Sequence, residues 1–290
     1  MKRHAWQWIS VVSLLMTVAV IQFLVTGQGK SSPVLSRNVA QQPHSQLVSR
    51  QLGADHASGE MSRVLIIGSS VAQGWKDHPQ DGGYLRRAFR ALPDVSNNQF
   101  VVYDKGLPGL GVTHIVKQYP HWLKTIRPNI VVIAWGGLDD LHAKTPMPVF
   151  QSQIKWQIAK ALQAHAVVIV VTSPVSRASY TNYKTAQPQL FDAETTIAKN
   201  FHNPNVHEFY IFNQMKRYLT THHQTYVPYM GDGWHPNAAG HELAAELFID
   251  DWSQQFGVQS VKFHDHKKHA FQTSAPEKVD FSNSAAAKGV

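Results

Sequence analysis

The sequence contains no cysteine among its 290 residues. This absence excludes a disulfide framework, a zinc site built on thiolates and a cysteine nucleophile. Charged residues are also scarce, at 16% of the chain, whereas hydrophobic residues make up 43%. The composition therefore allows a substantial buried core but leaves open whether the chain holds one large domain or two small ones.

The positive charges are scattered instead of gathered into one basic segment. The formal net charge is +8, yet Lys and Arg form only short clusters such as Arg86-Arg87 and Lys267-Lys268. Without a register of basic and aromatic residues, we expect no binding to DNA or RNA. Attraction to an anionic cell surface or polymer is the preferred interpretation of this charge.

The amino-terminal segment lacks charge from Ala5 to Gly27, directly after Lys2 and Arg3. A bilayer core takes about 20 apolar residues, whereas the apolar part of a secretory signal usually has about 7–15. We therefore predict that residues 1–27 form an uncleaved transmembrane signal anchor. The positive charges place the amino terminus in the cytoplasm and the remainder outside the membrane. The alternative is a cleaved signal peptide and a secreted protein.

Two polar segments flank a region of regular hydrophobic pattern. Residues 28–61 are rich in Gln and Ser and predict a flexible tether. Residues 259–290 predict a polar, disordered carboxy-terminal tail. The region between them, 62–258, is expected to fold as the functional domain.

Short apolar runs alternate with helical patterns inside this domain. The runs that predict buried strands are 63–70, 100–106, 129–135, 166–173 and, more weakly, 206–212. The helical patterns are 82–92, 113–126 with Pro120 inside it, 148–165, 192–201 and 237–256. This alternation predicts a three-layer α/β/α fold around a parallel sheet. Ligands bind such sheets beyond the carboxyl ends of their strands.

The first three strands are followed by loops that each permit two interpretations. Ser69 and Ser70 end the first run and either present a hydroxyl at the sheet edge or cap a helix. The second loop, "DKGLPGLGV", either allows close backbone approach to a ligand or is a plain connecting loop, and it lacks the G-K-[ST] of a phosphate-binding loop. Asp139 and Asp140 follow the third run and either bind a metal or cap a helix.

The stretch "YMGDGWHPNAAGHELAAELF" at 229–248 holds an acid three residues before a histidine. It predicts a turn followed by a helix. The same spacing lets a tight turn bring Asp232 against one imidazole nitrogen of His235, which fixes the tautomer and leaves the other nitrogen free as a base. These loops all fall at the same predicted edge of the sheet.

Over residues 62–255 the sequence resembles the SGNH/GDSL hydrolase superfamily. "GSSVAQG", "KGLPG", "GLDD" and "DGWHP" are similar to its motif blocks. The resemblance implies a flavodoxin-like fold with strand order 2-1-3-4-5 and hydrolysis of esters by a Ser70, His235 and Asp232 triad. It further implies an oxyanion hole formed by the N–H groups of Ser70 and Gly109 and the side chain of Asp139. No metal or organic cofactor is expected. An α/β-hydrolase fold fits less well, because its acid and histidine come from separate loops.

Two residues depart from the family pattern. Ser69 replaces the aspartate that usually precedes the nucleophile, and Asp139 replaces an asparagine that donates to the oxyanion. An ionised carboxylate has no proton to donate, and losing one donor costs about 10²–10³ in turnover. Asp139 donates only if burial or Asp140 raises its pKa. We therefore expect an enzyme that is slow, prefers acidic pH or uses a rearranged oxyanion hole. The alternative is a weakened domain that binds glycan.

Trp75, Trp135 and Trp234 lie beside the motif blocks. Their rings either stack on sugars or pack within the protein. Combined with an extracytoplasmic, basic domain, the first interpretation predicts an O-acylated surface glycan as the substrate. The leading hypothesis is O-deacetylation. Hydrolysis of lipids or small esters, O-acetyl transfer and non-enzymatic scaffolding of envelope assembly are the alternatives.

Overall fold

The apolar, β-branched runs form the strands of one parallel sheet. The computed structural model describes residues 61–265. Its strands are β1 (Met61–Gly68), β2 (Gln99–Asp104), β3 (Ile130–Ala134), β4 (Val167–Val171) and β5 (Val206–Phe209). They pair in the order β2-β1-β3-β4-β5 and every pair is parallel. This confirms the predicted α/β fold and its strand order.

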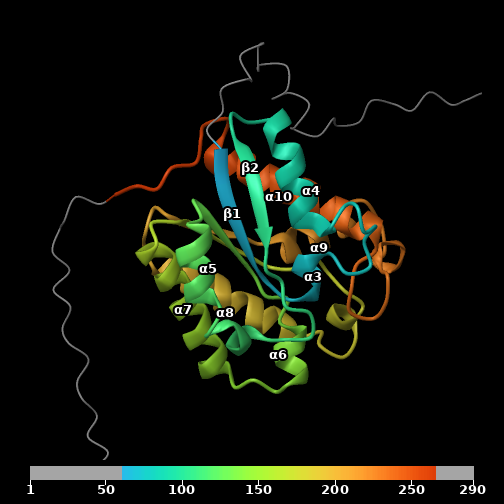
Figure 1. Cartoon of the computed structure of the whole chain (residues 1–290). Coiled ribbons are helices and arrows are strands. Elements are labelled where there is room, and N and C mark those ends of the chain that lie inside the picture. The colour runs from blue at the N-terminus through green and yellow to red at the C-terminus, as the bar shows by residue number, and fades with distance from the viewer. Residues whose placement is uncertain (1–60, 266–290) are drawn as a thin grey trace, which may run out of the picture. The chain divides into compact units, whose positions relative to one another are not determined.

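Helices cover both faces of the sheet (Figure 1). On one face lie α4 (Gly83–Ala91) and α10 (Ala238–Phe256), with α9 (Ile211–Thr221) packed on α10. On the other lie α5 (Tyr119–Ile126), α7 (Met147–Gln163) and α8 (Ala186–Asn200). Single-turn helices α3 (Ser70–Gln73) and α6 (Leu138–His142) follow β1 and β3. Short 3₁₀ turns are η2 (Leu92–Asp94), η3 (Val112–Ile115), η4 (Ala178–Tyr180) and η5 (Val227–Tyr229).

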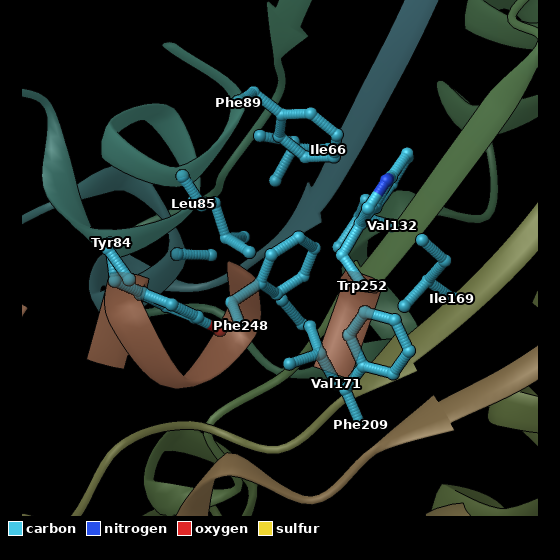
Figure 2. Close-up of a cluster of buried hydrophobic side chains, with 14 of the residues drawn as sticks. Ile66, Tyr84, Leu85, Phe89, Val132, Ile169, Val171, Phe209, Phe248 and Trp252 are labelled. Carbon is cyan, nitrogen blue, oxygen red and sulfur yellow. The ribbon is translucent and has the colours of Figure 1, made fainter. Parts of the chain in front are cut away.

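Alternate residues of each strand enter different core layers. Val64 and Ile66 pack toward α4 and α10, whereas Leu65 and Ile67 pack toward α5, α7 and α8. This is the two-residue period of a strand buried on both faces. Figure 2 shows the first layer, in which Phe248 of α10 lies among the sheet residues, with its ring centroid 5.5 Å from that of Phe89. Both layers fix the sheet and so hold the loops at its carboxyl edge.

Three predicted elements differ from the observed ones. The pattern at 113–126 splits into η3 and α5, because Pro120 has no N–H to donate and fits only the first turn of a helix. Helix α8 begins at Ala186, six residues before the predicted start. The fifth strand ends at Phe209, and Ile211 opens α9, a helix that the sequence pattern did not predict.

The carboxy-terminal boundary at 258 is also corrected. Residues after it pack along the domain, since Asn98 and Asn205 act as hydrogen-bonding clamps. The Asn98 side chain donates to the Gln259 carbonyl at 3.0 Å and accepts from Val261 N at 3.0 Å. Asn205 pairs in the same way with His264, at 3.0 and 2.7 Å. The tail predicted from residue 259 is therefore structured as far as 265.

The predicted anchor at 1–27 lies outside the described residues, as does the tether at 28–61 except for Met61, the first residue of β1. Within residues 61–265, no helix combines the length and hydrophobicity needed to cross a membrane.

Candidate active site

Ser70 stands at the turn where β1 passes into α3. Gly68 makes this turn possible, because a Cβ at that position would lie 2.2 Å from the Ala134 carbonyl oxygen. Ser69 occupies the position before the helix with extended backbone, but its side chain makes no capping hydrogen bond. The helix-cap interpretation therefore does not explain the paired serines.

His235 and Asp232 form a hydrogen-bonded chain with this serine. Ser70 Oγ lies 2.9 Å from His235 Nε2, and His235 Nδ1 lies 2.9 and 3.0 Å from the two Asp232 carboxylate oxygens. A carboxylate accepts only, so the His235 Nδ1 carries the hydrogen and donates to it. In the neutral ring, Nε2 is then the free acceptor for the Ser70 proton.

The Asp232 carboxylate also organises its own turn. It accepts hydrogen bonds from the backbone N–H groups of Trp234 at 2.7 Å and His235 at 2.8 Å. Partial burial raises the pKa of Asp232, but these hydrogen bonds and the His235 ring outweigh it and hold the pKa below its ordinary value. Asn237 then caps α10 by accepting from Gly240 N at 3.0 Å. The stretch is thus a turn before a helix and also a carboxylate–imidazole pair.

The glycine-rich second loop runs against the first loop. Leu107 N donates to the Gly68 carbonyl at 2.8 Å. Two residues later, Gly109 has φ +75°, a left-handed conformation that disfavours any side chain, and the space where a Cβ would lie is open. The part of Gly109 in an oxyanion hole stays a prediction.

The third loop brings Asp139 to the same place. A Cβ at Gly136 would lie 3.6 Å from the Ser69 hydroxyl, and the Ser69 side chain is near enough to Asp139 to influence the pKa of its carboxyl. Burial, followed by the charge of Asp140, raises the pKa of Asp139, while His235 and Ser69 oppose this. A raised pKa favours the protonated carboxyl, which is the form that can donate a hydrogen bond to an oxyanion.

Asp140 has a structural contact instead of a metal-binding one. Its carboxylate oxygens lie 3.3 and 3.2 Å from Val112 N, which donates to them. A Cβ at Gly111 would lie 2.3 Å from one of these oxygens, so only glycine permits the approach. Residues 61–265 contain no group of three or more His, Asp or Glu side chains that could hold a metal ion.

Two buried glutamines, which the sequence analysis did not single out, hold the second and third loops from separate helices. Gln157 of α7 donates to the Val112 carbonyl at 3.1 Å and accepts from Trp135 Nε1 at 2.8 Å. Gln187 of α8 donates to the Gly136 carbonyl at 2.7 Å. A sequence signal existed for Gln157, because it sits at a core-facing helix position beside Ile158.

The three tryptophans occupy different environments. Trp75 is 48% exposed, and its ring centroid lies 5.6 Å from that of His235. Trp234 contacts the rings of His142 and Tyr183, with centroids 5.7 and 6.3 Å away.

Trp135 requires a correction. Its side chain is 1% exposed and belongs to the core layer that faces α7. The hydrogen bond to Gln157 fixes its indole there. No sugar ring can stack on it, so the expectation that Trp135 binds substrate is not met.

A known protein family matches most of this domain. Residues 66–243 match the GDSL-like Lipase/Acylhydrolase family. No curated protein matches the chain.

Several solved structures share the fold. A catalytic mutant of Axe2, an acetylxylan esterase from Geobacillus stearothermophilus, is 16% identical with a TM-score of 0.54, covering 68% of this chain and 95% of that one. A lipase/acylhydrolase from Enterococcus faecalis is 18% identical with a TM-score of 0.52, covering 69% and 100%. LAE5, an alpha/beta hydrolase enzyme from the metagenome of Lake Arreo, is 18% identical with a TM-score of 0.53, covering 69% and 97%.

At these identities the structural likeness supports the fold alone, whereas the family match spans more than half of the sequence and includes the Ser70 and His235 loops. The chain therefore belongs to the GDSL-like lipase/acylhydrolase family of ester hydrolases.

Proposed function

We propose that the protein is a serine esterase in which Ser70 is the nucleophile, His235 the general base and Asp232 the residue that orients it. The observation that carries this proposal is the hydrogen-bonded chain from Ser70 Oγ through the imidazole to the Asp232 carboxylate. In this chain His235 Nε2 can accept the Ser70 proton, and Asp232 fixes the tautomer that leaves Nε2 free to do so.

The reaction has two steps. Ser70 Oγ attacks the acyl carbonyl while its proton passes to His235 Nε2, and the tetrahedral intermediate expels the alcohol, which takes up that proton. Water then attacks the acyl-Ser70, His235 again accepts a proton, and the serine leaves with it. Asp232 stabilises the imidazolium in both steps. The protein's own groups suffice for this sequence.

The developing oxyanion is stabilised by the N–H groups of Ser70 and Gly109 and by Asp139 in its protonated form. Burial, followed by the charge of Asp140, raises the pKa of Asp139, so this carboxyl keeps its proton to a higher pH than an ordinary aspartate. Once ionised, the carboxylate would repel the oxyanion. The activity should consequently decline as pH rises and the Asp139 carboxyl ionises.

The preferred substrate is an O-acetylated glycan of the cell surface. The exposed Trp75 ring and the Trp234 ring both lie at the His235 loop, where they are suited to contact a sugar. Structures that share the fold include an acetylxylan esterase. The predicted anchor at 1–27 would hold the domain at the outer side of the membrane, close to such a polymer.

Asp139 supports one alternative, a catalytically weakened domain that binds glycan. Transfer of the acetyl group to a sugar hydroxyl instead of water is a variant of the main proposal, since the triad does not choose the acceptor.

Hydrolysis of 4-nitrophenyl acetate by the full-length protein, measured from pH 5 to 8, tests the proposal. We expect activity that falls at least a thousandfold in Ser70→Ala, because the attacking atom is lost. Exposed Ser152→Ala on α7 serves as the control and should retain the wild-type rate. Equal background rates in wild type and Ser70→Ala at every pH would favour the glycan-binding alternative.

A further inference from the structure

A pocket outside the triad adjoins the loop that carries Asp232. Its volume is about 460 Å³, within the range of about 300–1,000 Å³ typical of small-ligand sites. Arg177, from the loop after β4, and Tyr226 contribute to its wall, together with Met230, Asp232 and Gly233. The pocket and the candidate active site thus share one loop.

The backbone around Arg177 is firmly placed. The next residue, Ala178, donates from its N–H to the Gly233 carbonyl at 2.9 Å, which ties this loop to the Asp232 turn. On the preceding side, Ser176 N donates to the Ser179 hydroxyl at 2.9 Å. These bonds fix the origin of the Arg177 side chain relative to the triad loop.

The Arg177 guanidinium has no partner among the described residues. Its side chain makes no ion pair or hydrogen bond with any residue from 61 to 265, although the residue lines a pocket. A guanidinium carries five N–H donors in a planar fork that matches a carboxylate or a phosphate. The pocket therefore offers an available anion-binding group.

The aromatic part of the wall is also held in one orientation. The Tyr226 ring stacks on that of Tyr180, with centroids 4.3 Å apart and an interplanar angle of 14°. Lys216 Nζ lies 5.9 Å from the Tyr180 ring centroid. A fixed ring beside a free guanidinium is suited to a sugar that carries an acidic substituent.

We propose that this pocket binds an acidic sugar unit of the substrate, with its anionic group on Arg177 and its ring near Tyr226. The proposal rests on the proposed function, because the same glycan would present its acylated unit to Ser70. The anionic group is a carboxylate or a phosphodiester. Asp232 also lines the pocket, but its negative charge does not exclude an anion. Hydrogen bonds within its own turn and Lys76 Nζ, 3.8 Å away, compensate that charge.

Binding to full-length Ser70→Ala protein, which cannot turn over substrate through the serine, tests the pocket separately from catalysis. Three unacetylated probes are titrated by NMR: a galacturonic acid trimer, a glucose unit that carries a methyl phosphodiester, and neutral xylotriose. Arg177→Gln is then introduced, with Arg217→Gln as a control of equal charge change; Arg217 lies on α9 and lines a different pocket.

We expect at least one anionic probe to bind about tenfold more tightly than xylotriose, as one charge-assisted contact allows. Arg177→Gln should abolish this preference and Arg217→Gln should retain it. The preferred probe identifies the carboxylate or the phosphodiester as the ligand. Equal binding of all three probes, or an equal loss in both arginine variants, would overturn the proposal.

The result also separates this proposal from the proposed function. An Arg177-dependent preference in a protein that hydrolyses no ester would support the pocket and refute the esterase. Conversely, Ser70-dependent hydrolysis without any preference for an anionic probe would support the esterase and refute the pocket.

Discussion

The proposed proton-transfer half of the site is built largely from one short turn, whereas the proposed oxyanion half is assembled from two loops held by distant helices. Asp232 and His235 are three residues apart and hydrogen-bond directly. Gly109 and Asp139, in contrast, lie on loops whose carbonyls are held by Gln157 and Gln187. The first half follows from local sequence, while the second depends on the tertiary fold, and it is also the half that departs from the family pattern.

The largest effect should come from breaking the proton-transfer half. Asp232→Asn keeps the size of the side chain but loses the charge that orients and stabilises the imidazole, so kcat for 4-nitrophenyl acetate should fall about 10⁴-fold. Lys76→Gln removes only a partly exposed ion pair, in which Lys76 Nζ lies 3.8 Å from the Asp232 carboxylate. This variant should change kcat less than about threefold. Comparable losses in both variants would contradict the assignment of Asp232.

The proposed oxyanion half can be tested by Asp139→Asn, which restores the asparagine of the family pattern. As pH rises, wild-type Asp139 loses the proton that donates to the oxyanion, so kcat should fall. Because its pKa is raised, this loss begins at a higher pH than for an ordinary aspartate. The amide of Asp139→Asn does not titrate, so the variant should lack this alkaline decline and exceed wild type by about 10²–10³ at alkaline pH.

The control for this pH profile is Asp94→Asn, an exposed change in η2 at the far end of α4. It should leave the profile unchanged. An alkaline decline that persists in Asp139→Asn would show that another group causes it.

The support of the oxyanion loops can be weakened without touching the reacting groups. Gln157→Leu removes the bonds to the Val112 carbonyl and Trp135, and we expect kcat to fall about 10–100-fold with little change in KM, since small misplacements are costly. Gln187→Leu should act similarly through the Gly136 carbonyl.

Exposed Gln151→Leu on α7 is the matched control for these changes. A purely structural role for Gln157 would lower the melting temperature but leave kcat unchanged well below it. That outcome would separate packing from positioning.

The smallest effect concerns stability. Glu194 is fully buried, its carboxylate oxygens have no hydrogen-bond partner within the described residues, and burial raises its pKa well above the ordinary value. The folded state therefore keeps a proton that the unfolded chain releases above about pH 4.5, so this group lowers stability as pH rises. Glu194→Gln should remove that loss.

Thermal melts from pH 4 to 8 check this expectation. The difference in melting temperature between Glu194→Gln and wild type should widen with pH. Glu208→Gln, which breaks a surface pair with Lys199 at 3.7 Å, should show no such trend. A constant difference for Glu194→Gln would contradict the expectation.

The sequence predicted the features whose signals are local. Continuous apolar runs predicted the strands, and the spacing of Asp232 and His235 predicted their direct contact. The helical pattern places Gln157 on the buried face of α7, but its hydrogen bond to the buried Trp135 is a tertiary contact that only the structure shows. The strand predicted over 206–212 is too long for a related reason. Its apolar residues belong to β5 up to Phe209 and to the buried face of α9 from Ile211.

The central claim is that Ser70 is a nucleophile activated by His235, and covalent labelling tests it most directly. Full-length protein is treated with a fluorophosphonate and the modified peptide is identified by mass spectrometry. We expect one phosphonylated residue, Ser70, with labelling that is slowed at least a hundredfold in His235→Ala. Unmodified Ser70, or equally fast labelling in His235→Ala, would contradict it.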